Sequence, residues 1–265
     1  IDPSQLENAV LNLCINAILF IGGAVVPPLG HGASFDPAAD QPASLRFFGS
    51  TTAELFTKEI AASYEGVLRR NYISDQDAHF PPGFVRASPP GQPWADTFWT
   101  RDGGTFLREL VFWGYTEHAC QTADCLIKMV GKNDQGFYSF PEYFSAGDKK
   151  SGDELDGTSS ILIGMVLLYQ RLPADHPFKA TLYDFLHGAA SPARYIHQRL
   201  HTTPLLAGEG EFGGGCGING QFYNVVQNNL AMLALTAVGS MESEAGDHAL
   251  TDAYLADART IRDNM

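Results

Sequence analysis

The segment WTRDGGTFLRELVFWGY, residues 99–115, is the stretch on which the fold prediction rests. It opens with an aromatic residue, a cation and an anion, Trp99, Arg101 and Asp102, and two glycines follow. Apolar residues then recur at helical spacing, which predicts a helix from Gly103 to about Tyr115 with one buried face. A polar and aromatic group is therefore expected at the N-terminus of a buried helix.

This group of side chains suits a neutral, polyhydroxylated ligand. Charged groups make short hydrogen bonds to hydroxyls, and an indole ring can cover the apolar face of a sugar. A purely structural alternative is equally open. Asp102 and Thr105 are both placed to cap the helix, Arg101 can form a salt bridge with Asp102, and Trp99 can belong to the core.

The composition excludes several classes of function. The chain has 265 residues, 45% of them hydrophobic and 18% charged, which is typical of a globular protein with one large or two small domains. Seventeen Lys and Arg against 30 Asp and Glu give a net charge of −13. This disfavours nucleic acid and anionic membranes as partners, because binding phosphate needs clustered positive charge. No glycine-rich dinucleotide fingerprint is present, and no cofactor is predicted.

Cysteine and histidine spacing does not indicate a metal site. The four cysteines, at positions 14, 120, 125 and 216, form no CxxC pair. Cys216 lies in a glycine-rich loop, where packing is a simpler role than that of a reactive thiol. His197 and His201 are four residues apart on an expected helix, but the sequence offers no evident carboxylate partner. No metal is therefore predicted.

Residues 1–17 resemble the first nucleotide-binding box of sensor histidine kinases. In that family an acidic residue and asparagines one helical turn apart handle magnesium and ATP, and the matching positions are Glu7, Asn12 and Asn16. The resemblance ends at Ala17, and no glycine-rich nucleotide lid follows. An ATPase function is therefore not implied.

Residues 18–26 are apolar but too short to span a bilayer, which takes ~20 residues. Pro27, Pro28 and a run of small residues follow, as in the core and cleavage region of an export signal of a secreted or periplasmic protein. The residues before this segment lack the expected Lys or Arg. We therefore interpret residues 1–35 as a segment outside the domain, of junction or signal-like character, and residues 36–265 as the domain.

The remainder of the chain is predicted to be all-α, since no strand-like alternation is sustained. Helices are expected near 51–70, 103–115, 116–130, 156–169, 175–201 with a break at Ser191-Pro192, 221–238 and 247–261. The most apolar of them open near 103, 156 and 221, and each follows a long aromatic or acidic loop. This repeat predicts three inner helices entered from one end, so that their preceding loops line one cavity.

Three groups of candidate ligand-binding residues lie in these loops. They are Trp99, Arg101 and Asp102; Glu142, Tyr143, Glu154 and Asp156; and Glu209, Glu211, Tyr223 and Asn224. The neighbouring aromatics Tyr138, Phe140 and Phe144 suit a sugar-stacking wall together with Tyr143, or equally the core.

The order of these motifs resembles the six-hairpin glycosidases, the (α/α)6-toroid enzymes that include glucoamylases and glycogen-debranching glucosidases. WTRD, ELDGTS and YNVVQNNLAMLAL each enter an inner helix, and the resemblance covers roughly residues 50–265. It implies an inverting glycoside hydrolase acting on an α-linked glucan or oligosaccharide. A full toroid has twelve helices and about seven are expected here, so the resemblance is to a partial toroid.

The resemblance also implies residue roles. Trp99, Arg101 and Asp102 would grip the non-reducing sugar, and Asp156 or Glu154 would supply the general acid. The region that carries the general base in this family is missing, so Glu209 or Glu211 is the candidate substitute. Alternatives are an N-cap role for Asp156 and a solvated loop for the two later glutamates.

Two other functions remain open on the same architecture. A sugar epimerase or polysaccharide lyase would transfer protons through His79 or Tyr143. A non-catalytic carbohydrate-binding or interaction protein is favoured by the missing C-terminal helices. A half-formed toroid would also expose apolar inner helices, which favours self-association.

Overall fold

The structure is a computed structural model, and it describes residues 35–40, 55, 58–59, 62–63, 66–68, 70–74, 80–145, 153–207 and 223–265. All of these belong to one compact unit, residues 32–265. The kinase-like motif at Glu7, Asn12 and Asn16 and the apolar segment 18–26 lie outside the described residues. So do Glu209, Glu211, His79 and Cys216.

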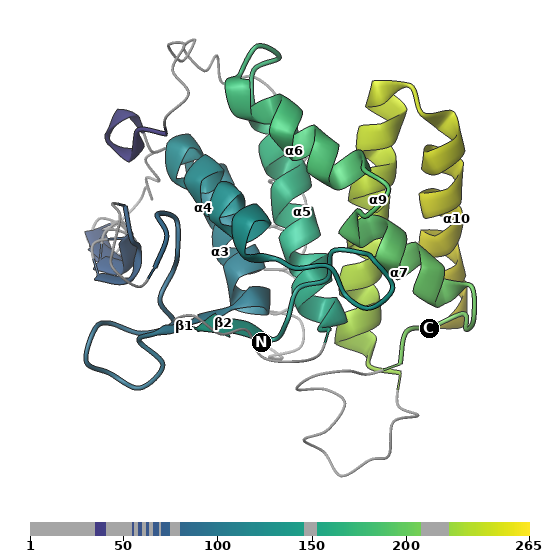
Figure 1. The fold of residues 1–265 in the computed structure, drawn as a ribbon, viewed down its shortest axis with the longest axis horizontal. Coiled ribbons are helices and arrows are strands. Elements are labelled where there is room, and N and C mark those ends of the chain that lie inside the picture. The colour runs from purple at the N-terminus through teal and green to yellow at the C-terminus, as the bar shows by residue number, and fades with distance from the viewer. Residues whose placement is uncertain are drawn as a thin grey trace. The chain divides into compact units, whose positions relative to one another are not determined.

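The described part of the chain is mostly helical, which confirms the all-α prediction (Figure 1). Its seven α-helices are α3 (Thr100–Trp113), α4 (Thr116–Met129), α5 (Leu155–Arg171), α6 (Pro177–His187), α7 (Pro192–Leu200), α9 (Val225–Ala245) and α10 (His248–Asn264). The described residues among 55–71 are also helical, as expected for the first predicted helix. None of the helices described is both long enough and apolar enough to cross a membrane.

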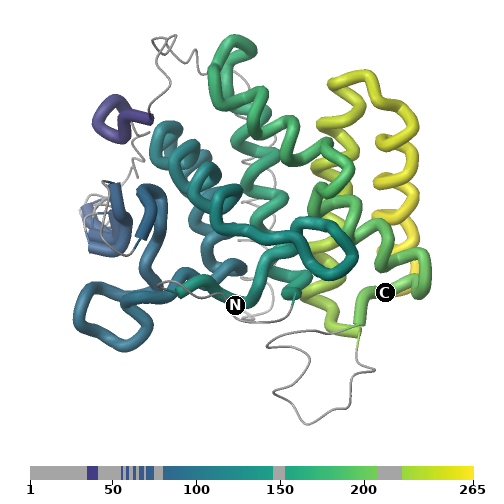
Figure 2. The backbone as a smooth tube through the Cα atoms, viewed as in Figure 1, coloured from purple at the N-terminus to yellow at the C-terminus, as the bar shows by residue number. Residues whose placement is uncertain are grey.

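Three helices form an inner row, and the helices between them return along its outside. α5 packs between α3 and α9, while α4 packs on α3, α6 and α7 pack on α5, and α10 packs on α9. α3, α5 and α9 all begin at the lower end in Figures 1 and 2. The predicted common entry end of the inner helices is thus observed, whereas closure into a toroid stays a prediction.

α3 and α5 approach each other closely because glycines face the contact. A Cβ atom on Gly104 would lie 2.3 Å from the backbone carbon of Ser160, and one on Gly164 would lie 3.0 Å from the side chain of Leu107. The Ser160 hydroxyl also donates to the carbonyl oxygen of Arg101, at 2.9 Å. α3 begins at Thr100 and not at Gly103 as predicted. Gly103 leaves room for the Phe98 ring and Gly104 allows close packing on α5, so neither breaks the helix.

α5 is apolar nearly all round and is buried along most of its length, as its sequence predicts. The predicted helix over 175–201 is two helices. Ser191 caps α7 by accepting a hydrogen bond from the Ala193 backbone, and Pro192 occupies the first helical position. The Ser-Pro break noted in the sequence is therefore a complete helix end.

α9 and α10 form an antiparallel hairpin that turns at Gly246, which has a φ of 85°. Asp247 caps α10 by accepting from the Leu250 backbone. At the other end of α9, Val225 and Val226 are exposed, and so is Leu233 further along. Self-association through such apolar surface stays a prediction.

The described chain also contains a small antiparallel sheet, which the sequence analysis did not predict. It consists of β1 (Thr97–Trp99) and β2 (Tyr143–Ser145), with Trp99 opposite Tyr143. Strands of three residues are too short to show a reliable alternation of polar and apolar residues. The sheet fastens residues 143–145 to the residues that lead directly into α3.

The segment at residues 35–40 joins the domain at the start of α4. It holds a short 3-10 helix, η1 (Pro37–Ala39). The Asp40 carboxylate accepts hydrogen bonds from the backbone N–H groups of Glu117 and His118, at 2.8 and 3.1 Å. A side chain from far along the chain thus caps α4.

Candidate active site

A cleft of about 270 Å³ lies at the N-terminal ends of α3 and α5. Its lining consists of Trp99, Arg101, Asp102, Glu142 and Glu154. β1 leads directly into α3 and places the first three of these residues, and the strand pairing brings Glu142 beside them. Residues more than forty positions apart in the sequence therefore share one cleft, as the repeat of inner helices predicted.

Aromatic rings form one edge of the cleft. The Trp99 ring lies 5.0 Å from the Tyr143 ring and 5.6 Å from the Trp94 ring, measured between centroids. Trp94 is 62% exposed and has a φ of 67°, which is uncommon for a residue other than glycine. The group offers an exposed aromatic surface of the kind that stacks on sugar rings.

The predicted sugar-stacking wall is smaller than the sequence allowed. Phe140 and Phe144 are buried in the core, and Tyr138 packs on Phe185 at 5.0 Å. Tyr143, in contrast, contacts the Trp99 ring, at an interplanar angle of 58°. Phe140 and Phe144 therefore correspond to the core alternative, and Tyr138 is partly buried against the core.

Arg101 links the two inner helices through charge. Its Nη1 lies 3.4 Å from Oδ2 of Asp156, whose side chain is completely buried, and its Nε lies 4.0 Å from Oδ1 of exposed Asp102. The predicted Arg101–Asp102 pair is therefore the longer and more solvated of the two contacts. The closer partner of Arg101 is the buried carboxylate on α5.

Asp156 is the second residue of α5 and is not its N-cap. The N-cap position belongs to Glu154, whose side chain makes no capping hydrogen bond. Asp156 Oδ1 accepts from the backbone N–H of Gly157 at 2.9 Å, so Asp156 still satisfies a donor at the helix start. Burial raises the pKa of Asp156, and both the Gly157 N–H and Arg101 oppose that rise.

Glu154 is the carboxyl group whose protonation changes near neutral pH. Burial, followed by the neighbouring charge of Asp156, raises its pKa to about 7, although Arg101 opposes the shift. Asp153, which the sequence places in the same acidic run, has a different role. It accepts hydrogen bonds from Tyr195 and Asn133. The effective carboxyl pair is therefore Glu154 with Asp156.

Thr100, at the start of α3, contacts the Glu154 carboxyl group. The Thr100 Oγ1 lies 2.6 Å from the carbonyl oxygen of Pro141 and 3.3 Å from Oε2 of Glu154. A hydroxyl has a single proton, and the shorter contact is the better donor geometry. A hydroxyl that donates to Glu154 favours the charged carboxylate, so this longer contact opposes the rise in the pKa of Glu154 without outweighing burial.

Two residues of this arrangement were not identified from the sequence. Thr100 stands inside the quoted motif, and Gly157 follows the acidic run. A Cβ on Gly157 would lie 2.3 Å from Thr100 Oγ1 and 2.9 Å from Glu154 Oε2. In the sequence, Gly157 was the signal for this arrangement. A small residue directly after Asp156 lets the Thr100 side chain of α3 reach the carboxyl pair.

Tyr223 and Asn224 are the described members of the third predicted group. Asn224 caps α9 by accepting from the backbone of Val226 and Gln227, and Tyr223 is 46% exposed. Neither is among the residues that line the cleft. Asn224 thus has a capping role, and substrate binding by Tyr223 and Asn224 stays a prediction.

The residues considered for thiol or metal chemistry also have defined surroundings. Cys120 and Cys125 are buried and free, and burial raises the pKa of both thiols, to about 12 for Cys125. His197 does have a carboxylate partner, because its Nδ1 lies 2.5 Å from Oδ2 of Asp257. This partner is sixty positions away, which is why the sequence did not reveal it.

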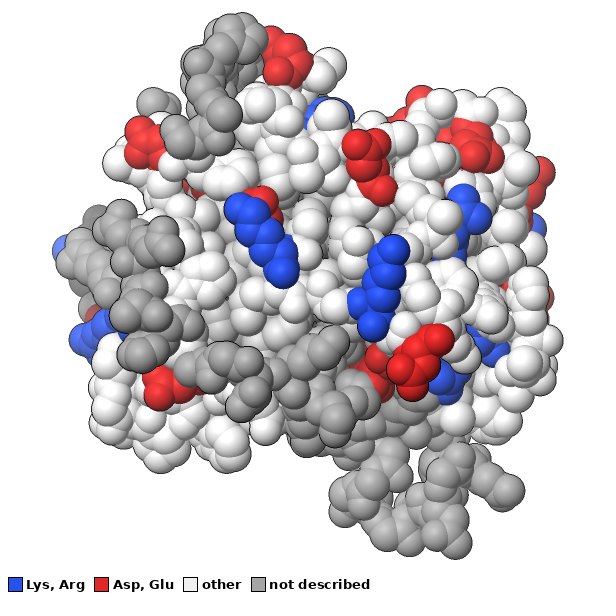
Figure 3. Space-filling view, viewed as in Figure 1, with Lys and Arg blue, Asp and Glu red and all other residues white. Residues whose placement is uncertain are grey.

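Comparison of the chain with protein-family models, with curated proteins and with solved structures found no match. Charged side chains on the face seen in Figure 3 are scattered, with single Lys and Arg residues among acidic ones.

Proposed function

We propose that the cleft binds and hydrolyses an α-linked glucan or oligosaccharide with inversion at the anomeric carbon. The observation that carries the proposal is the buried carboxyl group of Glu154, which lines the cleft and has its pKa raised to about 7. A general acid works best when its pKa is near the working pH. Glycoside hydrolysis needs such a group beside the glycosidic oxygen.

In this proposal Glu154 donates its proton to the leaving oxygen as the glycosidic bond breaks. Arg101 and Asp102 hydrogen-bond the sugar hydroxyls, and the Trp99 ring supports the sugar. Asp156 does not line the cleft, so it is a positioning residue that holds Arg101 and keeps the pKa of Glu154 high. Of the two acids that the resemblance offered, Glu154 is the better candidate.

A second carboxylate must activate water on the opposite side of the sugar. Within the described lining, Glu142 and Asp102 are the other acidic residues. Glu142 comes from the loop facing α3 and α5, whereas Asp102 stands beside Arg101. We propose Glu142 as the base and keep Asp102 as a binding residue.

The first test measures hydrolysis of maltooligosaccharides and follows the anomer of the released sugar by proton NMR. The proposal expects the β-anomer to appear first. Glu154→Gln should lower kcat by about 10²–10⁴-fold. An aryl glycoside with a good leaving group should be much less affected, because it needs little protonation. Asp153→Asn is the matched control and should retain activity, since Asp153 is bonded to Tyr195 and Asn133.

The base is tested by chemical rescue. Azide should restore turnover to Glu142→Gln and give a glycosyl azide of inverted configuration, whereas Asp102→Asn should mainly raise KM. Sugar binding without turnover by the parent protein would contradict hydrolysis and favour the carbohydrate-binding alternative. Activity that survives in Glu154→Gln and is lost in Tyr143→Phe would favour proton-transfer chemistry of the epimerase or lyase kind.

A further inference from the structure

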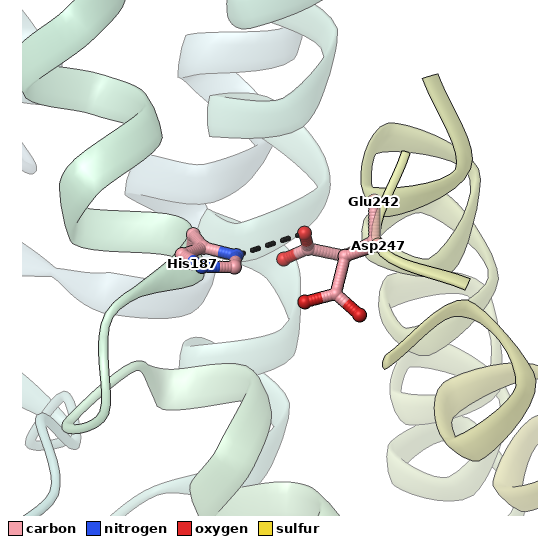
Figure 4. A group of neighbouring side chains, drawn as sticks. All are labelled: His187, Glu242 and Asp247. Atoms are coloured by element: carbon pink, nitrogen blue, oxygen red, sulfur yellow. Dashed lines mark hydrogen bonds and ion pairs between the residues drawn. The ribbon is translucent and has the colours of Figure 1, made fainter. Parts of the chain in front are cut away.

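A second cluster of ionisable side chains lies where α6 meets the turn between α9 and α10 (Figure 4). It contains His187 at the end of α6, Glu242 in the last turn of α9, and Asp247, the N-cap of α10. One ligand atom from each residue lies within 4.8 Å of the other two. These residues take no part in the cleft.

The unpaired oxygen of Glu242 is the feature that calls for an explanation. Glu242 is fully buried, and its Oε2 lies 2.9 Å from Nδ1 of His187. Its Oε1 is also buried but has no hydrogen-bond partner among the residues that the structure describes. Leaving a buried carboxylate oxygen unsatisfied is costly, so such an atom points to a missing ligand.

We propose that His187, Glu242 and Asp247 bind a divalent transition-metal ion, with Zn²⁺ as the representative case. One imidazole nitrogen and two carboxylate oxygens suit zinc, and an imidazole ligand argues against Ca²⁺ or Mg²⁺, which prefer oxygen. Ligand atoms at about 2.1 Å from a tetrahedral zinc are about 3.4 Å apart. The observed cluster reaches that spacing with small side-chain movements.

The surroundings favour this role over a simple ion pair. The Tyr183 ring stacks on the His187 ring at 5.0 Å with an interplanar angle of 12°, which fixes the imidazole plane. The His187 side chain is 35% exposed, so an ion can enter from solvent. Asp247 uses one oxygen to cap α10 and offers its carboxylate charge beside Glu242. The bound ion would join α6 to the α9–α10 hairpin and supply Glu242 with a partner.

The test measures Zn²⁺ binding to the full chain by calorimetry and by thermal unfolding. Every protein carries His201→Gln, because Nε2 of His201 lies 3.1 Å from Nε2 of His197 and zinc bound by this second histidine pair would obscure the result. The parent should bind one zinc ion at this site. A zinc concentration of about 100 times Kd should raise Tm by about 5 °C or more.

Three variants locate the binding. His187→Gln and Glu242→Gln should each weaken this zinc site at least tenfold and abolish the Tm increase. Asp247→Asn is the sharpest variant, because asparagine still caps a helix but has no charge. It should fold normally and lose zinc affinity. Asp257→Asn removes a carboxylate from a different His–carboxylate pair and is the control, expected to leave this affinity unchanged.

Equal zinc binding by the parent, His187→Gln and Asp247→Asn would overturn the proposal. So would a parent protein whose Tm does not respond to zinc. Circular dichroism of each variant without metal separates loss of the site from loss of the fold.

Discussion

Buried carboxyl groups at the two ends of the inner helices have different partners. At the cleft end, buried Glu154 and Asp156 stand at the start of α5, and their cation is Arg101. At the other end, buried Glu242 lies in the last turn of α9, and its partner is His187. An arginine is permanently charged and is not a metal ligand, whereas a histidine is often one.

This difference decides what each end can do. The helix start and Arg101 both favour anions, yet burial still raises the pKa of Glu154 to about 7. That end is suited to holding and releasing a proton. At the end of α9 the helix dipole disfavours an anion, so Glu242 gains from an added positive charge. The contrast depends first on the close packing of α3 on α5, which forms the cleft end.

Gly104→Ala should have the largest effect on stability. Its Cβ would meet the backbone of Ser160 and Ile161 at 2.3 and 2.5 Å, so α3 and α5 must separate. We expect a loss of about 3 kcal/mol in the free energy of unfolding, measured by urea denaturation. Gly66→Ala is the control, because that helical glycine has nothing within 4 Å of the added atom. Equal stability of the two variants would refute the close contact.

Arg101→Met should destabilise the protein more than His187→Gln does. Removing the guanidinium leaves Asp156 buried without its cation and raises the pKa of both Asp156 and Glu154 further. We expect a loss on the order of 2 kcal/mol at pH 8. His187→Gln should cost less than about 1 kcal/mol without metal, since glutamine keeps an N–H donor for the Glu242 carboxylate whereas methionine has none for Asp156.

The pH dependence distinguishes the two ends. A folded-state pKa above the unfolded value means that the folded protein holds protons that the unfolded chain has released, so stability falls as pH rises. The penalty of Arg101→Met should therefore shrink as pH is lowered from 8 to 5. A penalty that is independent of pH, or equal for both variants, would contradict the difference drawn between the ends.

Trp99→Leu should have a smaller effect, confined to sugar binding. It removes the ring that packs against Tyr143 and lines the cleft. We expect KM for a maltooligosaccharide to rise about tenfold, equivalent to ~1.4 kcal/mol, with kcat changed much less. Leu233→Ala, at an exposed position on α9, is the control. An unchanged KM would show that the Trp99 ring does not contribute to sugar binding.

The sequence predicts the layered arrangement because hydrophobic spacing reports which helices are inner ones. It also predicts that the Trp99–Asp102 motif meets the acidic run at Glu154 and Asp156, because inner helices entered from one end bring their loops together. Two consecutive glycines predict a helix break, but Gly103 leaves room for the Phe98 ring and Gly104 for α5, so α3 begins earlier than predicted, at Thr100.

Other features depend on contacts between distant segments. The β1–β2 pairing, the link of His197 to Asp257 and the cluster around Glu242 join residues more than forty positions apart. No local pattern encodes such contacts. The exchange of roles between Asp156 and Glu154 depends on burial and on which of the two carboxyl groups lines the cleft, and only the packed structure reveals both.

The most direct test of the account is the titration of the Glu154 side-chain carbon by ¹³C NMR, with Glu154→Gln used to assign the signal. The account predicts that this carboxyl changes protonation at about pH 7, because burial and Asp156 both favour its neutral form. It further predicts that Asp156→Asn lowers that pKa. A Glu154 that titrates near pH 4.5, the ordinary value for a glutamate, would contradict the central claim.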